Sequence, residues 1–142
     1  MTELGCNRPY SIVLGRLRDA GLRPTRQRLG LAKLLFEYGD RHVTAEALHS
    51  EALQARLPVS LATVYNTLHQ FTQAGLLREV VVDSGRTYFD TNTGDHHHFY
   101  FEREGTLADI PGEAIEVLGL PHPPSGNRVS RVDVIVRIRP DA

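Results

Sequence analysis

The fold is decided by the stretch SLATVYNTLHQFTQAGL, which occupies residues 60–76. Ser60 is a typical helix N-cap, and Gly75 is a typical residue at a helix end. Between them, apolar side chains recur at the 3, 4, 3 spacing of a stripe that a helix buries on one face: Leu61, Val64, Leu68 and Phe71. The pattern predicts an amphipathic helix over about residues 61–73.

The opposite face of this helix carries side chains that can form hydrogen bonds: Thr63, Asn66, Thr67 and Gln70. Residues 60–73 contain no Asp, Glu, Lys or Arg, although long charged side chains usually fill an exposed helix face. Short uncharged donors and acceptors are what a helix needs to read base edges in the major groove of DNA. A solvated surface helix can carry a similar face, so both interpretations stay open at this point.

Further helices are expected before this one, and a β-hairpin after it. Apolar spacing, capping residues and breakers predict a helix over 10–20, a second from the cap Thr25 to the stop at Gly39, and a third that follows the cap Thr44 and ends before Pro58. Strands are predicted over 76–83 and 86–89, joined by a turn at 83–85. Helices followed by a hairpin are the order of a winged helix-turn-helix, whose last helix enters the major groove. We therefore predict a winged-helix DNA-binding domain over residues 10–90, after a flexible N-terminal tail at residues 1–9.

The second half of the chain has a different pattern. Residues 91–95 are expected to form a hinge. The segments beyond it are predicted as strands over 99–102, 106–110 and 132–138, a helix over 112–118 and a stiff surface connection over 121–126. A unit of about 50 residues at 96–142 has little room for a core of its own, so we expect it to form a homodimer or a higher oligomer. The fold class is therefore α+β: a winged helix-turn-helix followed by a small α/β dimerisation domain.

Charge is distributed unevenly along the chain. The formal net charge is −1, but residues 1–93 carry 11 basic and 9 acidic side chains, whereas residues 94–142 carry 5 and 8. Five arginines stand against the single acid Asp19 within one short window: Arg16, Arg18, Arg23, Arg26 and Arg28. Such a local patch permits DNA binding by a nearly neutral protein.

Cellular context follows from what the sequence lacks. The single cysteine, Cys6, excludes an internal disulfide, a zinc site of several cysteines and an iron–sulfur cluster. Neither a membrane-spanning apolar stretch nor a signal peptide is evident. We expect a cytoplasmic protein with no membrane partner.

The chemical centre of the second half is the run DHHHFYFE at residues 95–102. If the run enters a strand, His96 and His98 lie on one face, and His97 joins Asp95 on the other. Two imidazoles on one face, supplemented by carboxylates, suit Fe, Mn, Zn or Ni. A solvated polar run that binds nothing is the alternative interpretation.

Two motifs resemble those of the ferric uptake regulator (Fur) superfamily: residues 60–68 with 74–76, and residues 20–28. The resemblance covers roughly residues 10–140. It implies that Tyr65 contacts bases, that Ser60 and Thr63 hold phosphates, and that Arg23 approaches the minor groove of a double-stranded operator. Asn66 and Thr67 complete the predicted DNA-binding set, although the family commonly has a basic residue at the position of Asn66.

The same resemblance implies two metal sites. The ligands of an inter-domain regulatory site are His42, Asp90, His96, His98 and Asp109, with Asp replacing the family's Glu at positions 90 and 109. A second, sheet-associated site takes Asp95, His97 and Glu116, with Glu113 as an alternative ligand. The metal is expected to be Fe, Mn or Zn.

Departures from the family pattern point to one branch. The C-x-x-C pair that many relatives use for structural zinc is absent, and Glu102 and Gly105 lie near the equivalent stretch. The family's late C-terminal histidine ligand is also absent, and Arg131 lies close to its position. These losses and the histidine run resemble the iron response regulator branch found in rhizobia and related α-proteobacteria. That branch binds DNA when iron is scarce and releases it when haem binds. The resemblance implies haem ligation by the three histidines of the run: His96, His97 and His98.

Three other functions are alternatives to a regulator that haem releases from DNA. The first is a Fur-type repressor that binds DNA when loaded with Fe, Mn or Zn. A metal-dependent enzyme is disfavoured because the sequence has no His-Glu-x-x-His helix, nucleophile elbow or Gly-rich phosphate loop. A haem or metal carrier that does not bind DNA is the third. We therefore predict a regulator and not an enzyme.

Overall fold

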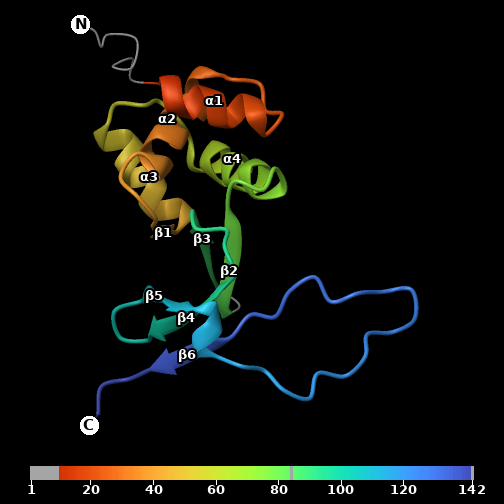
Figure 1. The fold of residues 1–142 in the computed structure, drawn as a ribbon. Helices are drawn as coiled ribbons and strands as arrows, with labels where there is room; N and C mark the ends of the chain where they lie inside the picture. The colour runs from red at the N-terminus through yellow and green to blue at the C-terminus, as the bar shows by residue number, and fades with distance from the viewer. Residues whose placement is uncertain (1–9, 84, 142) are drawn as a thin grey trace, which may run out of the picture. The chain divides into compact units, whose positions relative to one another are not determined.

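The computed structural model describes residues 10–83 and 85–141, so the predicted N-terminal tail and Cys6 lie outside the described residues. Figure 1 shows the α-helices within residues 11–73 and most of the strands after them. The chain divides into two compact units after Thr93, within the segment predicted as a hinge. Mixed helix and sheet, the predicted class, is confirmed.

Four helices form most of the first unit: α1 (Ser11–Asp19), α2 (Arg26–Phe36), α3 (Ala45–Gln54) and α4 (Leu61–Gln73). The three predicted N-caps are confirmed by hydrogen bonds from backbone N–H groups to side-chain oxygens. Thr25 accepts from Arg28, Thr44 from Ala47, and Ser60 from Thr63. The helix α4 ends before Gly75, whose φ of +83° is unfavourable for residues with a side chain.

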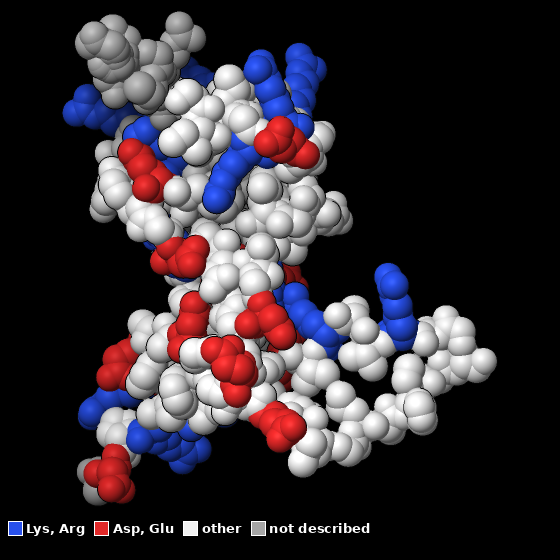
Figure 2. Space-filling view, viewed as in Figure 1, with Lys and Arg blue, Asp and Glu red and all other residues white. Residues whose placement is uncertain are grey.

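Basic side chains gather on the first unit. Figure 2 shows Lys and Arg side chains over the end of this unit that carries α1. Arg16 and Arg18 lie in the last turn of α1, where a positive charge also stabilises the helix C-terminus. The guanidinium of Arg16 lies 4.6 Å from the ring centre of Phe36, which restrains part of this surface.

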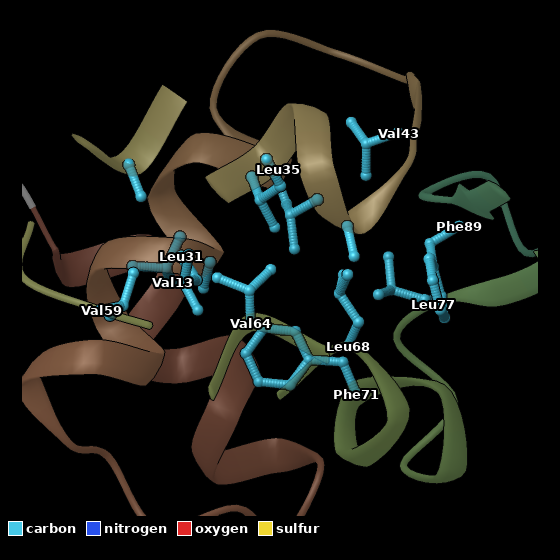
Figure 3. Close-up of a cluster of buried hydrophobic side chains, with 14 of the residues drawn as sticks. Val13, Leu31, Leu35, Val43, Val59, Val64, Leu68, Phe71, Leu77 and Phe89 are labelled. Atoms are coloured by element: carbon cyan, nitrogen blue, oxygen red, sulfur yellow. The ribbon is translucent and has the colours of Figure 1, made fainter. Parts of the chain in front are cut away.

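The core of the first unit lies among its four helices, and Figure 3 shows the side chains meeting there. Val64, Leu68 and Phe71 of α4 are fully buried against residues of the other helices, Leu31 and Leu35 among them. Leu61, the fourth member of the predicted stripe, is half-buried at its edge. The predicted apolar face of α4 therefore holds the helix in the unit.

A three-stranded antiparallel sheet completes the first unit, with strand order β1-β3-β2. Its strands are β1 (His42–Val43), β2 (Arg78–Asp83) and β3 (Arg86–Asp90). The predicted hairpin is confirmed, although β2 begins at Arg78 and not at residue 76, and Ser84 of its turn lies outside the described residues. The two-residue strand β1 was not expected, because two residues are too short for a strand pattern to be recognised.

The second unit is a smaller sheet with strand order β5-β4-β6. Its elements are β4 (His96–Phe101), β5 (Thr106–Pro111), the 3-10 helix η2 (Gly112–Ala114) and β6 (Ile135–Ile138). The strand β4 pairs antiparallel with β5 and parallel with β6. It starts at His96, three residues before the predicted strand, so the whole histidine triplet belongs to the sheet.

Two predictions for the second unit are wrong. The helix expected over 112–118 stops after three residues, because Ile115 returns to extended backbone and the following apolar side chains find no partner: Val117 is 40% and Leu118 78% exposed. The last strand covers only Ile135–Ile138, the part that aligns with β4, and not the whole of 132–138. The register with β4 begins at Ile135, although the carbonyl of Val134 just before it still accepts from the backbone N–H of His98 at 3.2 Å.

The apolar core of the second unit is small. Among the described residues, only Tyr100 and Ile110 are buried apolar side chains of this unit, whereas Leu118, Leu120 and Val129 are more than half exposed. Three histidines are buried in the same sheet. Burial of so little apolar surface gives this unit little stability of its own.

None of the helices within residues 10–83 and 85–141 combines the length and the hydropathy needed to cross a membrane.

Burial of the α4 stripe gives a direct stability prediction. Replacing Leu68, which is fully buried, by Ala should lower the free energy of unfolding by roughly 2–5 kcal/mol through lost burial and a residual cavity. Leu53 is 55% exposed on α3, so L53A should change stability by no more than about 0.5 kcal/mol. Urea denaturation of both variants measures the difference, and equal midpoints would contradict this account of the core.

Candidate nucleic-acid interface and metal ligands

The face of α4 opposite the core is exposed and polar. Tyr65, Asn66 and Gln70 are exposed, and Thr63 is half-buried beside the Ser60 cap. Thr67 differs from expectation: only 5% of it is exposed, because the helical turn places it beside the buried stripe. The prediction that Thr67 lies on the open face is wrong, although it lines the edge of a surface hollow.

This hollow, of about 310 Å³, lies between α4 and the start of α2. One guanidinium nitrogen of Arg28 donates to the backbone carbonyl of Arg23 at 2.8 Å, and another donates to Oε1 of Gln70 at 2.9 Å. These two bonds hold a cation beside the uncharged face of α4. Arg23 itself is exposed, as its predicted contact with DNA requires.

Tyr65 lies at the edge of a second hollow, of about 350 Å³, to which α3, α4 and β3 contribute. Its phenol donates a hydrogen bond of 2.7 Å to Oε2 of Glu46, in the first turn of α3. This bond raises the pKa of Tyr65 above its ordinary value and lowers the pKa of Glu46 below its own. At neutral pH the pair is therefore a neutral phenol and a carboxylate.

The first unit places two predicted metal ligands together. The strands β1 and β3 pair His42 with Asp90, and Nε2 of His42 lies 3.3 Å from Oδ2 of Asp90. Asp90 is fully buried, and its other oxygen accepts from the backbone N–H of Asn92 at 2.9 Å. The carboxylate is thereby oriented so that one oxygen faces the imidazole.

The second unit places the other three predicted ligands together. His96 and His98 share one face of β4, with ring centres 4.6 Å apart, as strand alternation predicts. Asp109 on β5 aligns with His98, and its Oδ1 lies 3.5 Å from Nε2 of His96 and 3.6 Å from Nε2 of His98. Two imidazoles and one carboxylate converge.

The hydrogen bonds of His96 prepare it to bind a metal. Its Nδ1 lies 2.7 Å from the backbone carbonyl oxygen of Gly94. Because a carbonyl oxygen can only accept, Nδ1 carries the hydrogen, and in the neutral ring the lone pair is therefore on Nε2. A backbone carbonyl that orients a histidine in this way is a common outer partner of metal ligands.

The hydrogen bond of His97 has the opposite direction from that of His96. Its Nδ1 accepts from the backbone N–H of Val134 at 3.1 Å, so the hydrogen of the neutral ring is on Nε2 and no lone pair is left for a metal. Within the part of the chain that the structure describes, Asp95, His97, Glu113 and Glu116 form no cluster of three ligands. The structure does not assemble the second predicted site.

The residues that are brought together fit a divalent cation by the chemistry of their donors. Imidazole nitrogens and carboxylate oxygens are borderline-to-hard ligands, which suit Fe, Mn and Zn. Two histidines with one carboxylate are also the ligand set of many non-haem iron sites. His42 with Asp90 in one unit, and His96, His98 and Asp109 in the other, could each contribute to such binding.

Sequence reasoning missed two contacts on the first unit. Glu46 is 19 residues from Tyr65, and Gln70 is 42 residues from Arg28. No local spacing connects residues so far apart. The only sequence signal was weak: Gln70 falls on the uncharged face of α4, and Arg28 belongs to the arginine cluster.

Comparison with known proteins gives a consistent result. Residues 19–121 match the ferric uptake regulator family. The ferric uptake regulation protein of Neisseria gonorrhoeae is 30% identical over 106 residues, 74% of each chain, and that of Legionella pneumophila is 34% identical over 102 residues, 71% of this chain and 75% of the other. A ferric uptake regulator from Pseudomonas aeruginosa, solved with manganese, superposes with a TM-score of 0.66 at 26% identity, covering 89% of this chain and 96% of that one.

The donor set of the second unit can be tested by metal titration. D109N removes a charged ligand and should weaken the binding of Mn²⁺ or Zn²⁺ by at least about tenfold, which isothermal titration calorimetry measures. D133N is the matched control, because Asp133 lies in the same unit and pairs with Arg131. Equal affinities of the two variants would exclude Asp109 as a ligand.

Proposed function

Because the chain belongs to the ferric uptake regulator family, whose members are metal-responsive transcription regulators and not enzymes, we propose that it binds specific DNA sequences under control of a divalent metal. The observation that carries the proposal is the uncharged polar face of α4, which is exposed beside one cation, Arg28, held in place by hydrogen bonds. Such a protein acts in the cytoplasm, where bacterial DNA is found.

The first unit acts as a winged helix in this proposal. The helix α4 enters the major groove, and the β2–β3 hairpin follows the phosphate backbone. Tyr65 and Asn66 face base edges, while Ser60 and Thr63 hold a phosphate at the helix N-terminus, where free N–H groups favour an anion. The hydroxyl of Ser60 also donates to that of Thr63 at 3.0 Å, which fixes this pair. Thr67 is buried and lies beneath this surface.

The second unit mediates dimerisation in this proposal. Its small core and its exposed apolar side chains, Leu118 and Val129 among them, favour burial against a second copy of the chain. A dimer carries two α4 helices, which must match half-sites one helical turn of DNA apart, about 34–36 Å. The angle between the two units of each chain then decides whether both helices fit.

Metal control acts on this angle. His42 and Asp90 would hold the metal from the first unit, and His96, His98 and Asp109 from the second, so that residues 91–95 are held in one conformation. The metal supplies a divalent charge that attracts carboxylates and imidazoles together. Control of DNA binding requires only that these residues bind it more tightly in the DNA-binding arrangement than in others.

A haem response is the second candidate, and the resemblance of the histidine run to the iron response regulator branch favours it. His96, His97 and His98 are adjacent imidazoles, which are common axial ligands of haem iron. All three are buried, so haem could reach them only if the residues that cover them moved. Ligation at His97 would also release Val134. In this candidate, haem binding removes His96 and His98 from the metal site, and the protein releases DNA.

The second metal site stays a prediction. Asp95, His97, Glu113 and Glu116 would need His97 to exchange its bond to Val134 for a metal, and Glu113 and Glu116, both exposed, to move toward it.

One binding assay separates the two candidates. A duplex selected in vitro from random sequences serves as the operator, and binding is followed after removal of metal, after addition of Mn²⁺ or Zn²⁺, and after addition of haem. Metal control predicts that affinity rises on metal addition. A haem-released regulator predicts that affinity falls on haem addition.

Amino-acid replacements identify the residues on which the response of DNA binding to metal depends. H96A combined with H98A should abolish the response to metal, whereas H122A, a replacement in the exposed segment 121–126, should keep it. An unchanged response in the double variant would place the sensor elsewhere.

The salt dependence of DNA binding tests the cation beside α4. If Arg28 neutralises one phosphate, R28A should reduce the slope of log affinity against log salt by about one unit. Arg103 lies in the second unit, and R103A should leave the slope unchanged. An equal slope for wild type and R28A would contradict a phosphate contact by Arg28.

A further inference from the structure

The contact between Tyr65 and Glu46 contributes only modestly to the stability of the fold, since both side chains are exposed at the rim of a hollow. The hydroxyl of Tyr65 nevertheless has a defined partner, Oε2 of Glu46, at 2.7 Å. Glu46 belongs to α3, and Tyr65 to α4. The bond therefore orients a residue of the proposed recognition helix from the helix before it.

The chemistry of this bond limits what Tyr65 can offer to another molecule. A phenol has one O–H donor and oxygen lone pairs that accept. A carboxylate can only accept, so the hydrogen of Tyr65 is committed to Glu46. What remains toward solvent is an oxygen that accepts and the apolar edge of the ring.

We propose that Glu46 is a positioning residue that fixes Tyr65 as a hydrogen-bond acceptor, so that Tyr65 reads a base with an exocyclic amino group. In the major groove such a donor is offered by N6 of adenine and N4 of cytosine, whereas guanine and thymine offer acceptors at the same edge. The inference deepens the proposed function, on which it rests.

The surroundings keep Glu46 ionised, as this role requires. Glu46 lies in the first turn of α3, where the helix N-terminus favours a negative charge. The hydrogen bond from Tyr65 and a backbone hydrogen bond both lower the pKa of Glu46. Arg86 of β3 lines the same hollow and brings a positive charge to it.

Removal of the carboxylate should change specificity. In E46A the phenol of Tyr65 is released from its partner and can rotate to donate or to accept. Guanine and thymine then become acceptable at the contacted position, because N7, O6 and O4 are acceptors. Y65F has no hydroxyl, so E46A should have no further effect on base preference in the Y65F background.

The hydrogen bond itself can be tested without DNA. The chain has five tyrosines, and the bond raises the pKa of Tyr65 above the ordinary value of 10.0. In a spectrophotometric titration, the signal of Tyr65 is the one that is absent in Y65F. The pKa of this tyrosine should lie above 10.0 in wild type and return toward 10.0 in E46A. A curve for that tyrosine unchanged by E46A would exclude the bond in solution.

Base specificity tests the consequence. In vitro selection with wild type, E46A and Y65F identifies the position at which Y65F loses discrimination. Wild type should require adenine or cytosine there, and E46A should accept all four bases. Where that base is adenine, replacing it by purine, which lacks the amino group, should weaken wild-type binding about tenfold and affect E46A less, because the released phenol can still donate to N7. E37A removes an acid paired with Lys33 and controls for the change of charge.

The outcomes separate the two proposals. If wild type selects no sequence, the proposed function fails, and the inference fails with it. If wild type selects a sequence but E46A selects the same one with equal stringency, only the role of Glu46 is excluded. A requirement for guanine or thymine at the Tyr65 position would likewise exclude the acceptor role while leaving DNA recognition intact.

Discussion

Burial of the apolar stripe of α4 is the constraint on which the proposed DNA-binding surface depends. Val64, Leu68 and Phe71 are fully inside the core, so the helix cannot rotate about its axis without exposing large apolar side chains. The orientation of α4 about its own axis is therefore fixed, and it determines which residues face outward. Tyr65 and Asn66 point away from the core because they follow the buried Val64 by one and two positions, and each position turns the helix by about 100°. The uncharged face is then completed by contacts from other helices, Glu46 to Tyr65 and Arg28 to Gln70.

The histidine run shows how backbone partners divide similar side chains between different tasks. His96 faces a carbonyl with Nδ1, and its Nε2 lies 3.5 Å from Oδ1 of Asp109, whereas His97 accepts from the N–H of Val134 and holds the segment before β6. Neighbouring imidazoles on one strand thus differ in the nitrogen that carries the hydrogen. The sequence predicts that they lie on opposite faces, but the partner of each ring depends on residues far along the chain.

The helices and the hairpin of the first unit could be predicted from sequence, because the helices carry strong local signals: caps at Thr25, Thr44 and Ser60, and an apolar stripe with regular spacing. The second unit could not. Residues 112–118 have helical composition, but a helix there has no apolar surface to pack against, and tertiary context overrides propensity. For the metal ligands, alternation placed His96 and His98 together, whereas the convergence of Asp109 came from family resemblance and is explained by strand register. Thr67 was misplaced because it lies at the border between the buried and the open face.

The central claim is that the exposed face of α4 reads DNA, and a crystal structure of the protein with its selected duplex tests it most directly. The account predicts α4 in the major groove, with the side chains of Tyr65 and Asn66 within hydrogen-bond distance of base edges and Arg28 beside a phosphate. A complex in which DNA lies against another surface, with α4 facing solvent, would contradict it.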